Sequence, residues 1–142
     1  MIHGLDTGFL VAAEMVQHAE HSAARQAMTR LRAASDEIAI APQVLAEFMH
    51  VATDSRRFAQ PLDVKTAAQI AEQWWNARDV IQILPTPEAV TQYLAWVQQF
   101  SLGRKRLLDT LLAATYEKSG IQSLLTTNPA DFAVFGVFTF FR

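Results

Sequence analysis

Cysteine is absent from the 142-residue sequence, which excludes disulfide bonds, thiolate catalysis and zinc sites built from cysteine. Glycine and proline are sparse, with five of each, and there is no repeat, low-complexity tract or linker. The longest apolar run, over residues 132–141, contains Gly136 and Thr139 and is about half as long as a membrane-spanning helix requires. The first residues lack the basic and apolar stretches of a secretory signal, so we expect a cytoplasmic protein without a membrane anchor.

Charged residues are also scarce, at 18% of the chain, and the net charge of -2 gives no global positive field that would attract nucleic acid. Hydrophobic residues make up 51%, which indicates one compact globular domain over residues 1–142. Contact with an anionic partner would therefore depend on local basic clusters, each of which also fits an ordinary solvated surface. These clusters are Arg25, Arg30 and Arg32; Arg56 and Arg57; and Arg104, Lys105 and Arg106, which come shortly before an aspartate of interest.

Apolar and alternating segments separated by amphipathic stretches run through the whole sequence. We expect strands over residues 2–5, 37–41, 80–84 and 122–126, with a fifth in the apolar tail over 134–140. Helical spacing and capping residues predict helices over about 7–17, 22–32, 42–51 and 64–75, from 87 to the break at Gly103, and over 107–118. Strands that alternate with helices predict an α/β fold, a three-layer α/β/α sandwich with a central, mostly parallel sheet of four to five strands. Such sheets bind ligands beyond the carboxyl ends of their strands.

Four acidic residues stand where an acid is energetically expensive. Asp6 directly follows the first expected strand, and Asp131 follows the fourth, shortly after Asn128. Glu47 lies in the middle of an apolar helix, and Asp109 lies beside leucines near the start of another. A carboxylate in apolar surroundings requires a base, hydrogen-bond donors or a metal ion. Because two of the acids follow strand ends, they can meet at one edge of the sheet, where the other two could converge on them.

Each acid also has an ordinary structural explanation. Asp6 can cap the following helix, Asp109 lies at a helix N-terminus that favours an anion, and Asp131 can cap a turn. Glu47 has no capping role, and an ion pair with His50 or an arginine would be its structural explanation. The four acids are therefore either separate structural groups or one functional cluster.

Four segments carry a family resemblance. They are Leu5-Asp6-Thr7, residues 44–48 (VLAEF), residues 108–114 (LDTLLAA) and residues 125–132 (LTTNPADF). In this order and spacing, over essentially the whole chain, the sequence resembles the PIN domain family, and more narrowly the VapC-type toxin ribonucleases of bacterial toxin–antitoxin pairs. Each segment alone is a weak signal, whereas the four in order are specific.

The resemblance implies a Mg²⁺ or Mn²⁺ site whose acidic core is Asp6, Glu47 and Asp109. The fourth position is open, because some relatives carry an acid where this sequence has Asn128, and others use the acid at the position of Asp131. The residues implied are Asp6, Glu47, Asp109 and Asp131 for catalysis, with Asn128, Thr7 and Thr127 in support, and Arg104, Lys105 and Arg106 for the phosphates of RNA.

The activity implied is that of a metal-dependent endoribonuclease, the toxin of a type II toxin–antitoxin system, whose products carry a 5′-phosphate and a 3′-hydroxyl. We expect Asp6 and Asp109 to be direct ligands, since Mg²⁺ needs only one or two carboxylates and keeps several waters. Glu47 would hold a metal-bound water or act as general base. Asp131 or Asn128 would orient the attacking water or contact a second ion.

Two other functions stay open. A phosphatase could use Asp6 as a nucleophile, although the position of the second aspartate that such enzymes carry is Gly8 here. A PIN-like domain that has lost activity and only binds RNA or protein is compatible with Asn128 at the fourth position.

As a toxin-like nuclease, the chain would bind RNA and a cognate antitoxin, and we also expect a homodimer. The helices that carry Trp74, Trp75 and Trp96 are candidates for the dimer face or for a groove that holds the antitoxin. The same rings are also candidates for stacking on bases, although rings in amphipathic helices more often pack in a core.

Overall fold

The structure, a computed structural model, describes residues 1–142 and contains a central sheet of five strands. The strands are β1 (Ile2–Leu5), β2 (Glu37–Ile40), β3 (Val80–Gln82), β4 (Ser123–Leu125) and β5 (Thr139–Phe140). All neighbouring strands are parallel, in the order β3-β2-β1-β4-β5. The predicted α/β fold with a central parallel sheet is confirmed.

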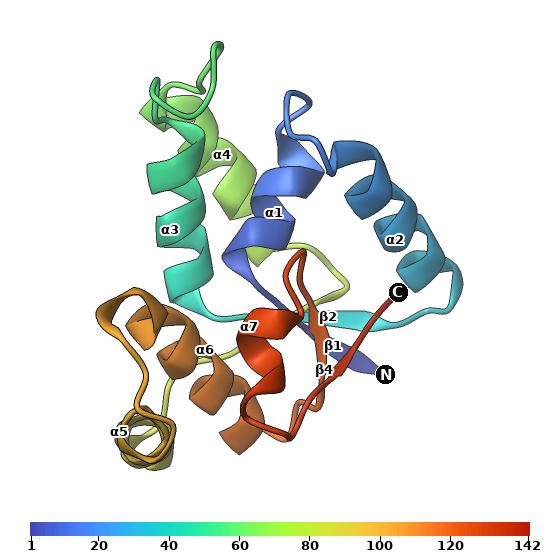
Figure 1. Ribbon diagram of the computed structural model, residues 1–142. Helices are drawn as coiled ribbons and strands as arrows, with labels where there is room; N and C mark the ends of the chain where they lie inside the picture. Colours follow the sequence, from blue (N-terminus) through green and yellow to red (C-terminus); the bar gives the residue numbers. More distant parts are fainter.

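Helices cover both faces of this sheet and complete the three layers (Figure 1). One face carries α1 (Thr7–Glu14), α2 (His21–Ala33), α3 (Pro42–Ala52) and α4 (Val64–Trp75). The other carries α5 (Pro87–Gln99), α6 (Leu107–Lys118) and the short α7 (Ala130–Ala133), and one turn of 3₁₀ helix, Arg104–Arg106, precedes α6. None of these helices combines the length and the apolarity that crossing a membrane requires.

Local sequence signals explain where several helices begin and end. The carboxylate of Asp63 caps α4 by accepting a hydrogen bond from the backbone N–H of Thr66 at 2.6 Å. Thr86 caps α5 in the same way, and Pro87 occupies the first turn, where its missing N–H costs nothing. Beyond the end of α6, Gly120 adopts φ +79°, a left-handed conformation that closes helices. These three predicted boundaries are confirmed.

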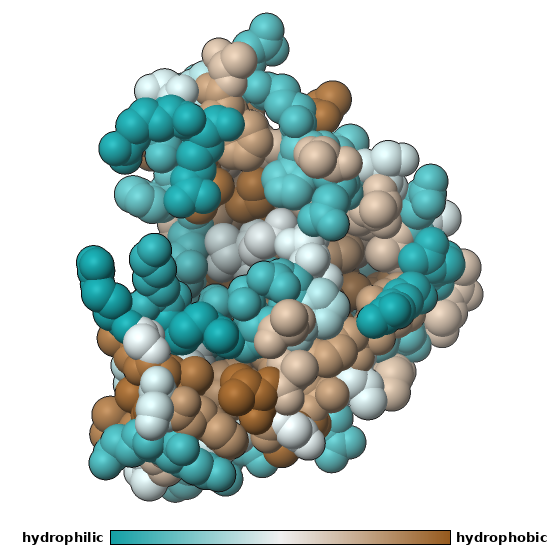
Figure 2. All heavy atoms as spheres, viewed as in Figure 1, coloured by the Kyte–Doolittle hydropathy of each residue, from teal (hydrophilic) through white to brown (hydrophobic).

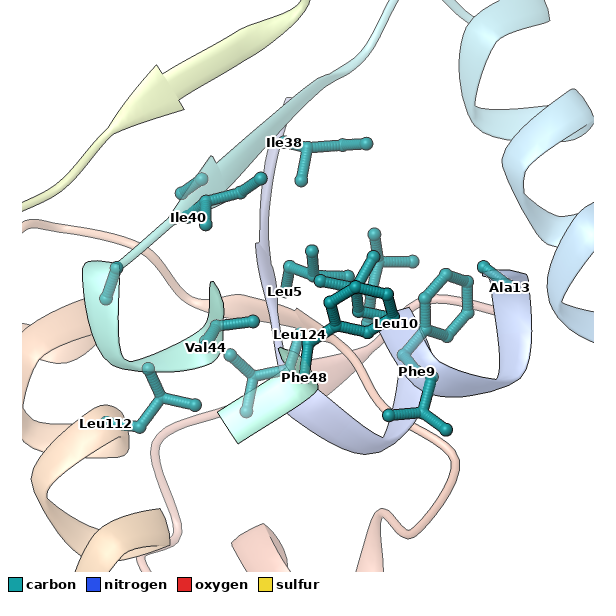
Figure 3. Close-up of a cluster of buried hydrophobic side chains, with 14 of the residues drawn as sticks. Leu5, Phe9, Leu10, Ala13, Ile38, Ile40, Val44, Phe48, Leu112 and Leu124 are labelled. Atoms are coloured by element: carbon teal, nitrogen blue, oxygen red, sulfur yellow. The ribbon is translucent and has the colours of Figure 1, made fainter. Parts of the chain in front are cut away.

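The core joins the sheet to both helical layers, with side chains from β1, β2 and β4 packed against α1, α3 and α6 (Figure 3). Because these side chains are almost wholly removed from water, their burial supplies the main stabilisation of the fold. The labelled members of this cluster are Leu5, Phe9, Leu10, Ala13, Ile38, Ile40, Val44, Phe48, Leu112 and Leu124.

Two of the three tryptophans also belong to the core. Trp74 is 8% exposed and Trp96 is 6% exposed, and Trp96 stacks on Phe135 with ring centroids 4.6 Å apart. The hypothesis that these two rings stack on bases is therefore wrong, whereas the outer sides of their helices stay open as partner surfaces. Trp75 is partly buried against the same core.

The apolar tail differs from the expectation of a strand over residues 134–140. Residues 130–133 form α7, and only Thr139 and Phe140 pair with β4. Phe132 and Phe135 are both buried, whereas Val134 and Val137 are exposed. The two buried phenylalanines are three residues apart, as on one side of a helical turn. In a strand, every second residue would be buried instead. The first helix is also shorter than expected, because Met15 is extended and ends α1 at Glu14.

The topology marks one place where a ligand can enter. From β1 the chain passes to α1 on one face of the sheet, whereas from β4 it passes to α7 on the other. Because β1 and β4 are neighbours, their carboxyl ends flank a crevice of the kind in which open α/β sheets bind ligands.

Candidate active site

A cleft of about 840 Å³ opens at this crevice. Figure 2 shows hydrophilic side chains on both sides of a hollow between the upper and the lower part of the view. The residues lining the cleft come from the ends of β1 and β4, from α1, α3, α6 and α7, and from the loops that follow α1 and α3. They include all the catalytic and supporting candidates expected from the sequence: Asp6, Glu47, Asp109, Asp131, Asn128, Thr7 and Thr127.

Asp6 lies where β1 turns into α1, and its side chain is almost wholly buried. Its Oδ1 accepts a hydrogen bond from the backbone N–H of Phe9 at 2.9 Å, and its Oδ2 accepts one from the hydroxyl of Thr126 at 2.5 Å. Burial raises the pKa of Asp6 to about 6, although both hydrogen bonds act to lower it. The capping explanation is therefore correct, yet the same carboxyl group also lines the cleft.

Glu47 extends from the middle of α3 into the cleft, and its side chain is partly buried. Burial raises the pKa of Glu47, and the charges of Asp109 and Asp6 raise it further. The hydroxyl of Thr7 lies beside Glu47 and partly offsets this rise. The expected structural alternative, an ion pair with His50 or an arginine, does not form.

Asp109 and Asp131 face the cleft from the other helical layer. Asp109 stands in the first turn of α6, where burial and the charge of Asp131 raise its pKa and the charge of Arg106 lowers it. Asp131 belongs to the first turn of α7 and is not its cap. The guanidinium of Arg106 lies 4.0 Å from the carboxylate of Asp131 and donates a hydrogen bond to its backbone carbonyl. Arg106 thus ties the start of α6 to α7.

The uncertain fourth position consists of two side chains held together. The amide of Asn128 donates a hydrogen bond to the carboxylate of Asp131 at 2.8 Å. Thr127 lines the same cleft, and its hydroxyl oxygen lies 3.0 Å from the point that a Cβ on Gly8 would occupy. Gly8 therefore keeps room between the start of α1 and the segment that follows β4.

Thr126 is a site residue that sequence reasoning missed, since only Thr7 and Thr127 were expected to support the acids. Its hydroxyl makes the hydrogen bond to Asp6. The register of the sheet explains this contact: Leu5 of β1 pairs with Leu125 of β4, so the next residues along the two strands are neighbours. The contact depends on this register, which leaves no local signal in the sequence.

Three of the four acids in the cleft have no ion-pair partner. No ion pair reaches Asp6, Glu47 or Asp109, and the pKa of each is raised. Carboxylates in such surroundings favour protonation or the binding of a cation. In the structure as it stands, no three histidine, aspartate or glutamate side chains lie close enough to share one metal ion.

The basic residues expected to contact the phosphates of RNA do not line the cleft, and one of them pairs with an acid. Arg104 and Lys105 are exposed and do not line the cleft, and Arg106 is bound to Asp131. Instead, Arg57 and His18 line it from the loops that follow α3 and α1. In the sequence, Arg57 belongs to one of three basic clusters. No signal in the sequence indicated that the loop after α3, which carries Arg57, borders the cleft.

The sequence profile of the PIN domain matches residues 5–136. No curated protein matches the sequence.

Several solved structures share the fold. VapC20 of Mycobacterium tuberculosis, described as a toxin that cleaves the sarcin-ricin loop, superposes with a TM-score of 0.71 at 22% identity, over 94% of this chain and 95% of its own. VapBC-1 from nontypeable Haemophilus influenzae gives 0.70 at 16% identity, over 99% and 96%. VapBC2 from Rickettsia felis, bound to a DNA fragment from its promoter, gives 0.67 at 18% identity, over 99% and 97%. At these identities the likeness establishes the fold.

Proposed function

The chain belongs to the PIN domain family, and from that premise we propose that it is a metal-dependent endoribonuclease that hydrolyses RNA phosphodiester bonds. The observation that carries this proposal is the gathering of Asp6, Glu47 and Asp109 in one cleft at the carboxyl edge of the sheet. The pKa of each of these three carboxyl groups is raised, and none has a cationic side chain as a partner. Such a cluster suits a divalent cation and a phosphate group.

The chemistry of these side chains fits Mg²⁺ or Mn²⁺, both of which prefer oxygen ligands. Mg²⁺ needs only one or two carboxylates, so Asp6 and Asp109 would suffice to hold the ion directly, and Glu47 would support it from α3. Gly8 leaves the space beside Asp6 open, since an added Cβ would lie 3.4 Å from its Oδ1. When bound, the ion supplies positive charge to the reacting phosphoryl group and lowers the pKa of a bound water.

The protein groups have distinct roles in the proposed reaction. Glu47 accepts a proton from the attacking water, and its raised pKa makes the carboxylate a stronger base. Thr126 fixes the orientation of Asp6 through its short hydrogen bond. The linked pair Asn128 and Asp131 orients the attacking water on the side of the cleft near α7.

Cleavage of structured RNAs by the purified protein tests this function. We expect cutting with Mg²⁺ or Mn²⁺ that stops in EDTA and falls at least about a hundredfold in Asp109→Asn. Asp63→Asn is the matched control, because Asp63 caps α4 and does not line the cleft. If freshly purified protein cuts no RNA under any of these conditions, an inactive binding domain becomes the better account.

We also propose that the chain is the toxin of a toxin–antitoxin pair that acts on RNA in the cytoplasm and binds a cognate antitoxin. Support comes from the similar structures, which include toxin–antitoxin complexes. We expect induced expression of the chain in a bacterial host to arrest growth, and expression of Asp109→Asn to leave growth unchanged. Arrest by both proteins would separate toxicity from cleavage and contradict this proposal.

A homodimer is the third part of the proposal. Val90 and Leu94 lie four residues apart, on the same side of α5, and about half of each side chain is exposed. A second copy of the chain would cover this apolar side. We expect light scattering after size exclusion to give a dimer mass at micromolar concentration, and Leu94→Glu to give the monomer. A monomer mass for the unaltered protein would contradict the dimer.

A further inference from the structure

The side of the cleft away from the acids of β1 and α6 is formed by two loops that belong to different parts of the chain. Residues 15–20 connect α1 to α2, and residues 53–63 connect α3 to α4. Figure 1 shows both loops at the ends of their helices farthest from the sheet. We call the parts of these loops that line the cleft the loop wall; it consists of Gln17, His18, Arg57, Phe58 and Ala59.

Hydrogen bonds and one buried ring hold the loop wall in place. The side-chain amide of Gln17 donates to the carbonyl of Gln60 at 3.0 Å and accepts from its backbone N–H at 3.0 Å. Phe58 is buried in the core, and the backbone N–H of Leu62 donates to the carbonyl of Ala52 at 2.9 Å. The loop after α3 is thus attached at its base, at its centre and to the neighbouring loop, so its side chains have defined positions at the cleft.

Arg57 is the only arginine or lysine that lines the cleft. Its Nε lies 3.7 Å from the carboxylate of Asp54, which also accepts a hydrogen bond from the Nε of Arg56 at 3.3 Å. Because Asp54 contacts Arg57 through Nε, the two terminal amino groups of this guanidinium have no protein partner. A guanidinium with both terminal groups free can bind a phosphate through two parallel hydrogen bonds.

His18 adds a second donor to the loop wall. Its Nδ1 accepts a hydrogen bond from the backbone N–H of Glu20 at 3.0 Å. In the neutral ring this contact leaves the proton on Nε2, which is then free to donate. The loop wall therefore presents N–H donors to the same cleft that the acids line.

We propose that Arg57, assisted by His18, binds a backbone phosphate of the RNA substrate next to the one that is cleaved. The acids of the cleft repel a polyanion, and a metal ion at the acids compensates only the reacting phosphate. A neighbouring phosphate needs a cation of its own, and Arg57 supplies it from the opposite wall. This inference rests on the proposed nuclease function, and it moves the expected phosphate contact within the cleft from the segment Arg104–Arg106 to the loop after α3.

Substitutions of two adjacent arginines test the inference. Arg57→Ala is compared with Arg56→Ala, because Arg56 shares the same loop and the same Asp54 partner but does not line the cleft. Binding of a short fluorescein-labelled single-stranded RNA of mixed sequence is measured in EDTA between about 50 and about 200 mM salt. Cleavage of the same RNA with Mg²⁺ then gives kcat and KM.

We expect Arg57→Ala to raise Kd and KM about tenfold while kcat changes less than about threefold. The slope of log Kd against log salt should fall by about 0.7, the value for one lost phosphate contact on a single strand. Arg57→Lys should recover part of the affinity because it restores the charge without the planar fork. His18→Ala should raise KM by a smaller factor than Arg57→Ala, and Arg56→Ala should match the unaltered protein.

Equal Kd, KM and salt slope for Arg57→Ala and Arg56→Ala would overturn the inference while RNA cleavage, and with it the proposed function, remained intact. Failure of the unaltered protein to cleave any RNA would remove the proposed function and this inference together. Thermal unfolding of each variant controls for damage to the fold. If Arg57→Ala unfolds more readily than Arg56→Ala, the comparison is repeated with Arg57→Gln, which keeps the length of the side chain.

Discussion

At the scale of single residues, Asp6 combines two effects that oppose each other. Its hydrogen bond to the backbone of Phe9 caps α1 and stabilises the helix. Its burial, however, removes a carboxylate from water, which raises its pKa from the ordinary value of 3.8 to about 6. Above pH 6 the Asp6 carboxylate of the folded protein is therefore charged in unfavourable surroundings. The binding of a cation would relieve this cost.

We expect Asp6→Asn to raise the free energy of unfolding at pH 7, in EDTA, by about 2 kcal/mol. A pKa displaced by about two pH units corresponds to at most about 3 kcal/mol, and the weaker hydrogen bond from Thr126 to a neutral amide reduces the gain. Asparagine keeps an oxygen that can cap α1. Urea unfolding of the two proteins measures the difference. A less stable variant would mean that the cap and the Thr126 contact outweigh burial.

The same group predicts a dependence on pH. Between about pH 4 and pH 6, the folded chain keeps the proton of Asp6 and the unfolded chain releases it, so this residue lowers stability as pH rises through that window. The advantage of Asp6→Asn should therefore be small at pH 4 and complete above pH 6. Asp63 is the control of opposite sign: its pKa is lowered by the backbone of Thr66, so Asp63→Asn should not stabilise the protein at pH 7.

At the scale of elements, one side chain of α6 aligns two strands with the site. The hydroxyl of Tyr116 donates to the carbonyl of Leu5 at 2.5 Å and accepts from the backbone N–H of Ala41 at 3.3 Å. Gly4 leaves room for its ring, since an added Cβ would lie 2.7 Å from the Cδ2 of Tyr116. These contacts set the end of β1, which carries Asp6, relative to the start of α3, which carries Glu47.

Tyr116→Phe should therefore affect both stability and catalysis. Loss of the hydroxyl leaves buried backbone groups of Leu5 and Ala41 unpaired, which costs about 1–3 kcal/mol in the free energy of unfolding. Because the end of β1 and the start of α3 lose their link, the positions of Asp6 and Glu47 relative to each other change, and we also expect kcat to fall more than KM rises. Tyr93→Phe is the control, since its hydroxyl makes no hydrogen bond within the protein. Equal stability of the two variants would contradict the role given to Tyr116.

The elements that could be predicted are those with a local cause. Asp63, the pair Thr86-Pro87 and Gly120 each satisfy or terminate a backbone hydrogen-bond pattern within a few residues, so their positions follow from the sequence. The tail lacked such a cause. An apolar run is compatible with a strand or with turns, and only packing against Trp96 decides that Phe135 is buried and Val134 exposed.

The residues of the site also divide into those that the sequence predicts and those that depend on tertiary contacts. The acids could be predicted to meet because Asp6 and Asp131 follow strands that end at one edge of a parallel sheet. Thr126 depends on the register between β1 and β4, and Arg57 depends on the path of a loop fixed by contacts distant in sequence. Neither register nor loop path leaves a local trace, so these two residues required the structure.

At the scale of the whole molecule, the acids come from both helical layers. Asp6 and Glu47 belong to the side of α1 and α3, whereas Asp109 and Asp131 belong to the side of α6 and α7. They form a cluster only when the two layers are packed on the sheet. Any ion that binds this cluster therefore binds the folded state in preference to the unfolded chain, and must stabilise it by linkage.

This linkage gives a test of the metal site that does not depend on cleavage. At a Mg²⁺ concentration of about 100 times Kd, the free energy of unfolding should rise by about 2.7 kcal/mol, which for a domain of this size raises Tm by about 8 °C. In Asp6→Asn or Asp109→Asn the rise should stay below about 2 °C. Potassium chloride at matched ionic strength controls for screening.

In EDTA, we expect Asp6→Asn to unfold at a higher temperature than the unaltered protein. Because Mg²⁺ stabilises mainly the unaltered protein, it should reduce or reverse this difference in Tm. An equal rise in all three would assign the effect of Mg²⁺ to another part of the surface.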